Sequence, residues 1–169
     1  MMMQISELVK AQGGLVLSRK ETKASGNGGC PYKRLTLRAL TEDGEIDSSA
    51  LEDFCASETL NHAWFASPGD VVIRLFSPLC PVVIEEGQEK LLVPSQLAIL
   101  KVKDCTILLP EFLKISLSQK EIQEKIRRIE SGTTQRVVKL GTIMELQIRR
   151  RRGGSLRWIR FAAKKSECT

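Results

Sequence analysis

The chain has 169 residues, of which 42% are hydrophobic and 27% charged, the composition of an ordinary globular protein with room for one domain and an appended tail. This composition excludes a chain that is disordered throughout, and because no apolar run reaches the roughly 18 residues that span a bilayer, we expect a cytoplasmic protein without membrane contact. The formal net charge of +6 is uneven: residues 1–135 hold 16 Lys and Arg against 18 Asp and Glu, and residues 136–169 hold 10 against 2.

The first forty residues predict a helix, two strands and a loop. The apolar residues of Met3–Ala11 recur at helical spacing before Gly13, which predicts a short amphipathic helix. A strand is predicted over Leu15–Arg19 and an exposed glycine-rich loop over Lys20–Pro31. Tyr32–Leu40 alternates apolar residues with basic or hydroxyl residues, which predicts a half-buried strand with a basic outer face.

The middle of the chain is predicted to be a β-meander. Thr41–Glu45 predicts a turn, and Ser48 is placed to cap a short helix over Ser49–Phe54. Pro68-Gly69-Asp70 predicts another turn, and the β-branched run Val71–Phe76 that follows predicts a central strand. Further strands are predicted over Val82–Ile84, Leu91–Val93 and Gln96–Val102.

The pattern becomes helical after Pro110. Apolar residues from Phe112 to Ile129 recur at intervals of three to five, which predicts one bent helix or two abutting helices. Val137–Ile148 predicts a brief strand and then a short helix. The sequence therefore predicts a mixed α/β domain over residues 1–148, a twisted and mostly antiparallel β-meander flanked by helices, followed by a basic C-terminal tail over residues 149–169.

No constellation of catalytic residues assembles in the sequence. The single histidine, His62, has no sequence cue to a partner, and Asp70 is better explained as a turn residue than as a metal ligand. The five cysteines form no C-x-x-C pair, so we expect reduced, mostly buried thiols and no zinc site. The glycine pairs match no phosphate-binding motif. We expect a protein that binds rather than transforms, with no cofactor.

Five segments in order resemble a known family. They are Ser67–Arg74, with Pro-Gly-Asp before a strand; Leu92–Leu100, a pair of strands; Leu109–Leu113, a Leu-Pro-Glu-Phe-Leu helix start; Ser131–Gln135, a Gly-Thr loop; and Val137–Leu146, a closing element. Together they resemble one target recognition domain of the specificity subunit of type I restriction-modification systems.

The resemblance covers about Ile5–Ile148 and implies a non-catalytic component that gives a defence complex its DNA sequence specificity. Its implied partners are double-stranded DNA, methyltransferase and restriction subunits, and a homodimer mate or second half-subunit. The family's spacer helix has no counterpart after Ile148, where Arg149–Arg152 follows instead, so the chain resembles a half-length or truncated form.

The resemblance also implies that loops of the domain enter the major groove, with polar side chains on base edges and Lys or Arg on phosphates. Candidate contacts in and around the first basic segment are Arg19, Lys20, Lys23, Lys33, Arg34 and Arg38. Further candidates are Ser95, Gln96, Arg127, Arg128, Thr133, Thr134, Gln135 and Arg136.

Structural explanations of the same residues stay open. The basic strand face can be merely solvated, and Ser131–Arg136 can be a helix end at Gly132. At the level of function, the main alternative is an interaction or assembly module with the same fold and no DNA contacts. A small nuclease is a third hypothesis, without an acid cluster or histidine pair in its favour.

Overall fold

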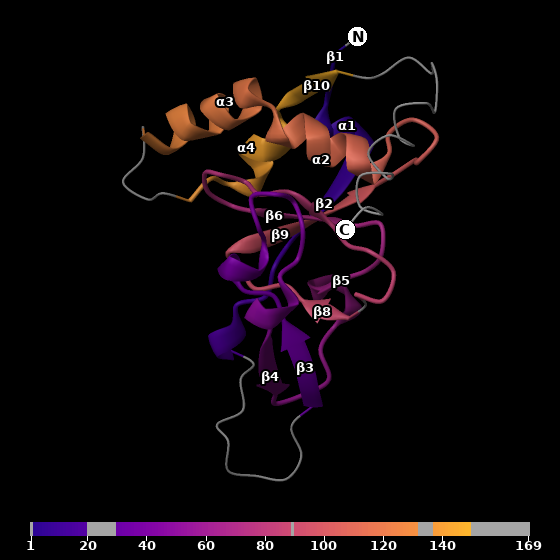
Figure 1. The fold of residues 1–169 in the computed structure, drawn as a ribbon, viewed down its shortest axis with the longest axis vertical. Helices are drawn as coiled ribbons and strands as arrows, with labels where there is room; N and C mark the ends of the chain where they lie inside the picture. The colour runs from indigo at the N-terminus through magenta and orange to yellow at the C-terminus, as the bar shows by residue number, and fades with distance from the viewer. Residues whose placement is uncertain (1, 20–29, 89, 132–136, 150–169) are drawn as a thin grey trace, which may run out of the picture.

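The computed structural model describes residues 2–19, 30–88, 90–131 and 137–149. The molecule is elongated, with helices gathered at one end and a two-stranded ribbon at the other (Figure 1). The described strands form two four-stranded sheets, ordered β2-β9-β6-β7 in the first sheet and β4-β3-β8-β5 in the second sheet, and one two-stranded sheet, β1-β10. The ribbon at the far end consists of β3 and β4 of the second sheet.

The first sheet is entirely antiparallel. Its strands are β2 (Val9–Gly13), β6 (Val71–Arg74), β7 (Val82–Val83) and β9 (Leu97–Val102). The turn before β6 needs Gly69, whose φ is +87°, and Asp70, whose carboxylate accepts the Ser67 N–H at 2.9 Å. This confirms the predicted Pro-Gly-Asp turn and central strand, although the strand ends at Arg74 rather than Phe76.

Both faces of the first sheet are buried, which explains why its central strands lack an apolar and polar alternation. Val71 and Ile73 of β6 pack into a core shared with the helices, whereas Val72 packs into a second core on the opposite face. In β9 the alternate residues divide in the same way, with Leu100 towards the helices and Ile99 away from them.

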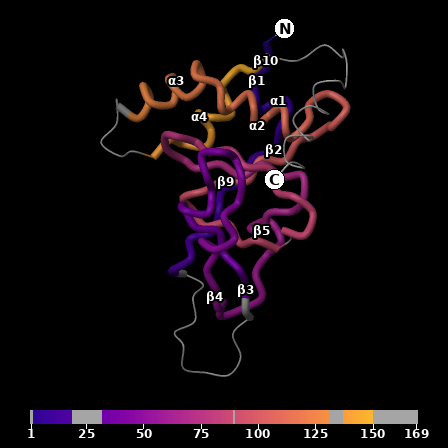
Figure 2. Tube along the Cα trace, in the orientation of Figure 1, coloured from indigo at the N-terminus to yellow at the C-terminus, as the bar shows by residue number. Residues whose placement is uncertain are grey.

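Four helices lie at one end of the molecule, around one face of the first sheet (Figures 1 and 2). They are α1 (Ile5–Leu8), α2 (Pro110–Ser118), α3 (Lys120–Ser131) and α4 (Leu140–Met144). The break between α2 and α3 shows that, of the two predicted alternatives, two abutting helices are formed rather than one bent helix. None of the helices in the described ranges is long and apolar enough to cross a membrane.

The second sheet lies towards the far end of the molecule. Its strands are β3 (Cys30–Arg34), β4 (Glu52–Ala56), β5 (Phe65–Ala66) and β8 (Leu91–Leu92), and β3 pairs antiparallel with β4 but parallel with β8. Because β8 leaves the first sheet, the middle strands do not form one continuous meander. A small third core containing Phe54, Phe65 and Leu92 supports this sheet.

The two ends of the described chain lie together at the helical end (Figure 2). β1 (Met2–Gln4) pairs antiparallel with β10 (Gln147–Arg149), and the Ile5 N–H donates to the Leu146 carbonyl at 2.9 Å. The last strand thus extends to Arg149, one residue beyond the predicted end of the domain. A brief strand is predicted at Val137, before the short helix. The strand that forms in this region is β10, which follows α4.

Two predictions near the N-terminus are wrong. The helix over Met3–Ala11 is a single turn between β1 and β2, because the flanking residues pair with strands from distant parts of the chain. Leu15–Arg19 is not a strand: Leu15 makes one isolated bridge to Pro94, and the 3-10 turn η1 (Leu17–Arg19) follows. Gly14 is required here, since a Cβ on it would lie 1.9 Å from the Pro94 carbonyl oxygen.

Two further predictions fail in the second sheet. The strand predicted over Tyr32–Leu40 ends at Arg34 and is followed by the 3-10 turn η2 (Leu37–Ala39). The helix predicted over Ser49–Phe54 is replaced by the 3-10 turn η3 (Ser48–Ala50), capped by Asp47 rather than Ser48, and then by β4. The predicted Thr41–Glu45 turn is confirmed, with Gly44 at φ +81°.

The mixed α/β fold with mostly antiparallel sheets flanked by helices is as predicted. The thiols are not mostly buried where the structure describes them, because Cys55 and Cys105 are exposed and only Cys80 is buried. Of the predicted loop over Lys20–Pro31, residues 20–29 lie outside the described residues, and Cys30 and Pro31 belong to β3.

Candidate nucleic-acid interface

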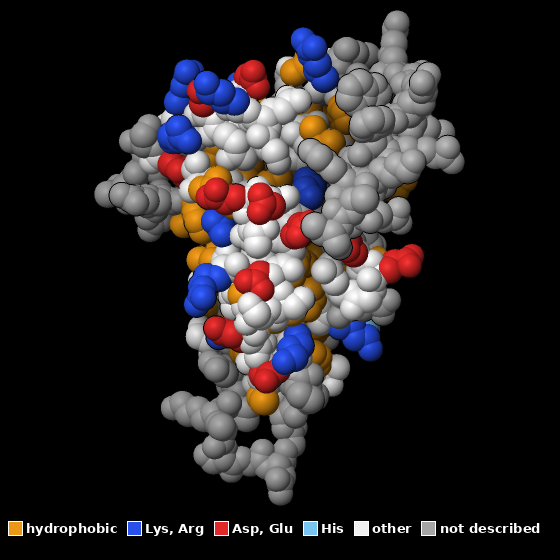
Figure 3. Space-filling view, viewed as in Figure 1, with side chains coloured by type: hydrophobic (Ala, Val, Ile, Leu, Met, Phe, Trp, Pro, Cys, Tyr) orange, Lys and Arg blue, Asp and Glu red, His pale blue; other side chains and the backbone are white. Residues whose placement is uncertain are grey.

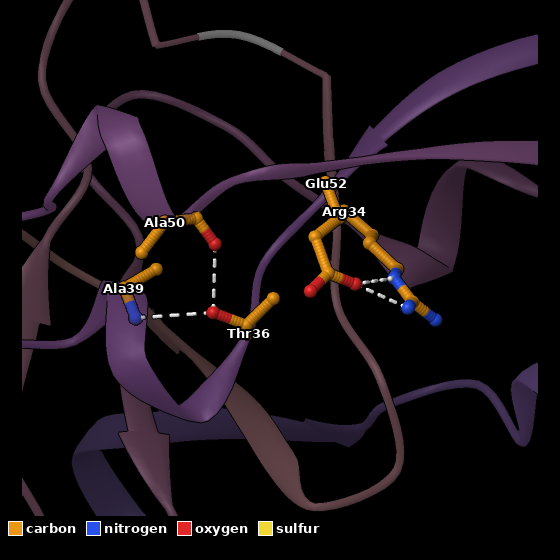
Figure 4. Close-up of polar contacts among 5 residues, drawn as sticks. All are labelled: Arg34, Thr36, Ala39, Ala50 and Glu52. Atoms are coloured by element: carbon orange, nitrogen blue, oxygen red, sulfur yellow. Dashed lines mark hydrogen bonds and ion pairs between the residues drawn. The ribbon is translucent and has the colours of Figure 1, made fainter.

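The predicted basic strand is paired with an acidic one. Lys33 Nζ lies 2.6 Å from Asp53 Oδ1, directly across the ladder from β3 to β4. Arg34 and Glu52 are the next directly opposed pair, and Arg34 donates to one carboxylate oxygen through both Nε, at 3.0 Å, and Nη2 (Figure 4). Both cations predicted to contact DNA on this strand are therefore already neutralised by neighbours.

The two ion pairs lie on opposite faces of the ribbon, because side chains alternate along a strand. Arg34 and Glu52 share a face with the buried Phe54, and their side chains are 30% and 54% exposed. Lys33 and Asp53 point to the other face and are 60% and 81% exposed. Packing beside the core therefore restricts Arg34, whereas the Lys33 pair is open to solvent and weak.

Arg38 lies on η2, a turn whose backbone is fixed on several sides. The Thr36 hydroxyl accepts the Ala39 N–H at 3.2 Å and donates to the Ala50 carbonyl at 2.8 Å, which joins η2 to η3 (Figure 4). The Ala39 carbonyl in turn accepts the Asp47 N–H at 2.8 Å. η2 is thus a rigid platform whose central residue, Arg38, is exposed.

Arg74 binds the backbone carbonyls at both ends of the same turn, η2. Its Nη2 donates to the Leu37 carbonyl at 2.7 Å and to the Leu40 carbonyl at 2.8 Å, on either side of Arg38. The guanidinium carbon lies 5.7 Å from the centre of the Phe76 ring, and the buried Nε has no hydrogen-bond partner among the described residues. Arg74 therefore ties β6 of the first sheet to the segment that carries Arg38.

The electrostatics around Arg38 leave it available for a ligand. The pKa of the exposed Asp47 is lowered below its usual value by the Ser49 hydroxyl, then by the Ser49 N–H, and in small part by the Arg38 cation. Yet Arg38 makes no ion pair with any residue in the described ranges. Among the three described basic candidates of this region, it alone has its charge unpaired by a described carboxylate.

Ser95 and Gln96 occupy an exposed turn between β8 and β9. The Leu97 N–H closes the turn on the Pro94 carbonyl at 3.0 Å, and the Gln96 carbonyl accepts the Leu75 N–H at 3.1 Å. The backbone of this turn is therefore fixed, and both side chains are open to solvent.

The candidates on α3 lie on a helix that is anchored to the loop after β6. Gln123 accepts the Leu79 N–H at 3.3 Å, and Glu130 accepts the Ser77 N–H, so both bind the loop after β6. Arg127 and Arg128 are exposed in the last turns. A helix C-terminus favours cations, which is a structural reason for arginines at this place.

The structure does not bring all the candidates into one patch. β3 and β4 lie at one end of the molecule and α3 at the other (Figure 1), and Lys and Arg side chains are interspersed with Asp and Glu in both regions (Figure 3). The side chain of Arg19 and the residues Lys20, Lys23, Thr133, Thr134, Gln135 and Arg136 lie outside the described structure. The best-defined group is therefore Arg34 and Arg38, with Glu52 and Arg74 behind them.

Sequence reasoning missed the roles of Glu52 and Arg74. Both left a signal: seven acids and no base between Glu42 and Glu58, and a single arginine inside the apolar run Val71–Phe76. An isolated cation in a buried strand requires hydrogen-bond acceptors, which Leu37 and Leu40 provide.

The residues considered for catalysis have ordinary surroundings. Asp70 is buried and its carboxylate binds the Ser67 N–H and Lys101 Nζ, the latter at 2.8 Å, so it is a turn residue as predicted. His62 is exposed beside the Asn61 cap of η4 (His62–Trp64). Within the described ranges no three His, Cys, Asp or Glu side chains are grouped so as to hold a metal.

Comparisons with solved structures decide what fold this is. A chain from a structural study of complex assembly and conformational transition in the type I R-M system superposes with a TM-score of 0.67 at 12% identity, over 99% of this chain and 41% of that one. The chain has the fold of part of a type I restriction-modification S subunit.

Two other S subunits agree with that fold. The subunit from M. genitalium matches with a TM-score of 0.50 at 15% identity, over 88% of this chain and 33% of that one. The HsdS subunit from Thermoanaerobacter tengcongensis matches with a TM-score of 0.55 at 15% identity, over 88% of this chain and 32% of that one. No family model and no curated protein matches the sequence. The chain thus spans at most about two-fifths of the S subunits it resembles.

Proposed function

We propose that the chain is a non-catalytic, sequence-specific reader of double-stranded DNA, acting as a specificity component of a type I restriction-modification system or a related defence complex. The observation that carries the proposal is the S-subunit fold, shared over 99% of this chain at a TM-score of 0.67. Residues 1–148 are the proposed recognition domain and residues 149–169 a basic tail.

The proposed contact surface is built on β3, η2 and β4. A two-stranded ribbon fits the major groove, and β4 is an edge strand that leaves the ribbon uncovered on one side. Arg38, exposed and unpaired with any described carboxylate, is placed to hold a phosphate. Ser95 and Gln96 are proposed as secondary polar contacts, and Arg127 and Arg128 as part of a separate basic surface.

General attraction to DNA is proposed to come from outside the described fold. The described ranges hold 16 Lys and Arg against 17 Asp and Glu, whereas the remaining residues hold 10 against 3. Each neutralised phosphate releases condensed counterions. Removal of residues 150–169 should therefore flatten the salt dependence of duplex binding, and an unchanged slope would show that the tail contributes nothing.

The proposed protein partners are methyltransferase and restriction subunits. A second copy or a second half-subunit is also proposed as a partner. Light scattering of the pure protein and of mixtures with candidate subunits tests these partners separately from DNA binding.

An assembly module without DNA contacts is the second candidate function. It is favoured by the near-neutral described fold and by the exposed acids from Glu42 to Glu58, which repel phosphates. This function predicts a stable complex with a protein partner and no duplex shift at moderate salt.

The deciding experiment is an unbiased duplex selection with the full chain at two salt concentrations, followed by affinity measurements on the selected sequence. We expect one enriched motif, and weaker binding by the alanine variants of Arg34, Arg38 and Arg136. Lys10→Ala, which removes an exposed cation from β2, is the matched control and should alter affinity little. Enrichment of no motif by the folded protein would reject sequence-specific recognition and favour the assembly module.

A further inference from the structure

The pair formed by Arg34 and Glu52 has a geometry that goes beyond general DNA binding. We propose that Arg34 reads a guanine base in the major groove, and that Glu52 is the positioning residue that aims its guanidinium. This inference rests on the proposed DNA-binding function. It names the base that is recognised, guanine, and the edge of the Arg34 guanidinium that recognises it.

The hydrogen bonds of the pair leave the required edge of the guanidinium free. A guanidinium carries five N–H donors: one on Nε and two on each Nη. Glu52 takes the Nε–H, at 3.0 Å, and one hydrogen of Nη2, both through a single oxygen. The edge between Nη1 and Nη2 remains, and Nη1 points away from the carboxylate (Figure 4). No described residue accepts a hydrogen bond from Nη1.

That free edge is the one that recognises guanine. Arginine binds guanine through two parallel N–H donors directed at O6 and N7, and this bidentate contact distinguishes guanine from the other bases. Two donors on a rigid fork must be aimed correctly in advance to select a base, because a freely rotating side chain also reaches phosphates. The Glu52 bond fixes the plane of the fork, and the neighbouring core limits its rotation.

The charge balance of the pair argues against a phosphate contact. Glu52 offsets the Arg34 cation at contact distance and would itself repel a phosphate held at the same place. A base edge carries no net charge, so its hydrogen bonds do not meet that repulsion. Arg38 on η2, which is unpaired with any described carboxylate, is suited to bind phosphate instead. Base reading and phosphate binding are thus assigned to different arginines.

The test compares base preferences as well as affinities. Duplex selection with the wild type should show a G·C preference at one position, and Arg34→Ala, Arg34→Lys and Glu52→Ala should each lose it. We expect discrimination at that position to fall about ten- to a hundredfold, with the other positions unchanged. Glu52→Ala is informative because it removes the acceptor and also makes the protein more positive: a phosphate contact predicts tighter binding to every duplex, whereas base reading predicts weaker discrimination.

Asp53→Ala is the matched control. It removes the same charge from the neighbouring residue of β4, but its partner is Lys33 on the opposite face of the ribbon. We expect a uniform change in affinity with the G·C preference intact, and thermal melts establish that each variant is folded.

The outcomes separate this inference from the function on which it rests. If the wild type selects a motif and Arg34→Ala weakens all duplexes equally while lowering the salt slope, Arg34 contacts phosphate and the inference is wrong. If Glu52→Ala leaves the base preference intact, Glu52 is not a positioning residue. If the wild type selects no motif, the proposed function itself fails.

Discussion

Replacing Arg74 by methionine tests the platform beneath Arg38. Methionine keeps the apolar stem and removes the guanidinium, with its hydrogen bonds of 2.7 and 2.8 Å to the Leu37 and Leu40 carbonyls. Net contributions of bonds from a charged donor are about 1.5–3 kcal/mol each. The contact with Phe76 adds about 0.5–1 kcal/mol.

An opposing contribution comes from the same guanidinium. The Nε of Arg74 is buried without a partner among the described residues, and removing such a group relieves about 1–3 kcal/mol. We therefore expect the free energy of unfolding to fall by about 3 kcal/mol. With a urea m-value of about 2 kcal/mol/M, the unfolding midpoint moves down by about 1.5 M.

Lys114→Met is the control for this stability change. Lys114 Nζ makes one bond, of 2.7 Å, to the Gly44 carbonyl, so its loss should cost about half as much. Equal destabilisation by the two variants, or a change below about 1 kcal/mol for Arg74→Met, would show that the two hydrogen bonds from Arg74 to the backbone at η2 contribute no special stability.

DNA binding gives the second measurement. Arg38→Ala should weaken binding to all duplexes and lower the salt slope by about 1. If Arg74 acts through Arg38, Arg74→Met weakens binding by a similar factor in the wild type but not in the Arg38→Ala background. Additive losses would refute the positioning role, because independent contacts add.

Three further predictions concern the fold. Asp70→Ala should lower the free energy of unfolding by about 2–3 kcal/mol, since the Ser67 N–H and Lys101 lose their acceptor. Asp70→Asn should lower it less, because its amide oxygen still accepts the N–H. Equal losses for the two variants in urea melts would contradict this. Burial raises the pKa of the Cys80 thiol, whereas Cys55 is exposed. Peptide mapping after brief alkylation at neutral pH should therefore find Cys55 labelled and Cys80 unlabelled. Early labelling of Cys80 would show that the core around it opens. Ile99→Ala should cost about 3 kcal/mol in urea unfolding, against little change for the exposed Ile115→Ala, and similar values would refute the double-faced burial of the first sheet.

The parts of the fold that the sequence predicted well are determined by nearby residues. The turn at Pro68-Gly69-Asp70 needs a glycine at positive φ and a carboxylate within three residues, and both signals are local. The strand after it is a short apolar run bounded by that turn. The helical region after Pro110 is similarly visible in the spacing of its apolar residues, although that spacing left open whether it forms one bent helix or two helices.

The parts that failed depend on distant pairing. Met3–Ala11 has helical periodicity, yet Val9–Gly13 lies beside β9, about ninety positions later in the sequence, and that ladder overrides the local preference. Tyr32–Leu40 alternates as a strand should, but Thr36 caps η2 and its hydroxyl binds Ala50, so the chain turns away after Arg34. Neither partner can be identified from the local pattern.

In the candidate site, too, the features that depend on nearby residues were predicted and those that depend on distant pairing were not. The alternation of Tyr32–Leu40 placed Arg34 on a strand, but that Glu52 is its partner follows only from the register of β3 on β4, which joins residues 18 positions apart. A slip of one residue would move Arg34 to the other face of the ribbon. The predicted basic strand face is not formed, because β3 ends at Arg34, Arg38 lies on η2, and Glu52 neutralises Arg34.

This neutralisation separates the sources of affinity and of selectivity in the proposed mechanism. A fold with 16 basic and 17 acidic residues in its described ranges gains little from general attraction to phosphates. A reader with that charge balance binds non-specific duplex weakly by itself. Its selectivity must come from base contacts, because specificity is the ratio of the specific to the non-specific affinity. Attraction supplied by a separate basic segment raises both affinities together and leaves the ratio unchanged. Removal of residues 150–169 should thus weaken binding to every duplex equally, while Glu52→Ala should change the ratio with the tail present or absent.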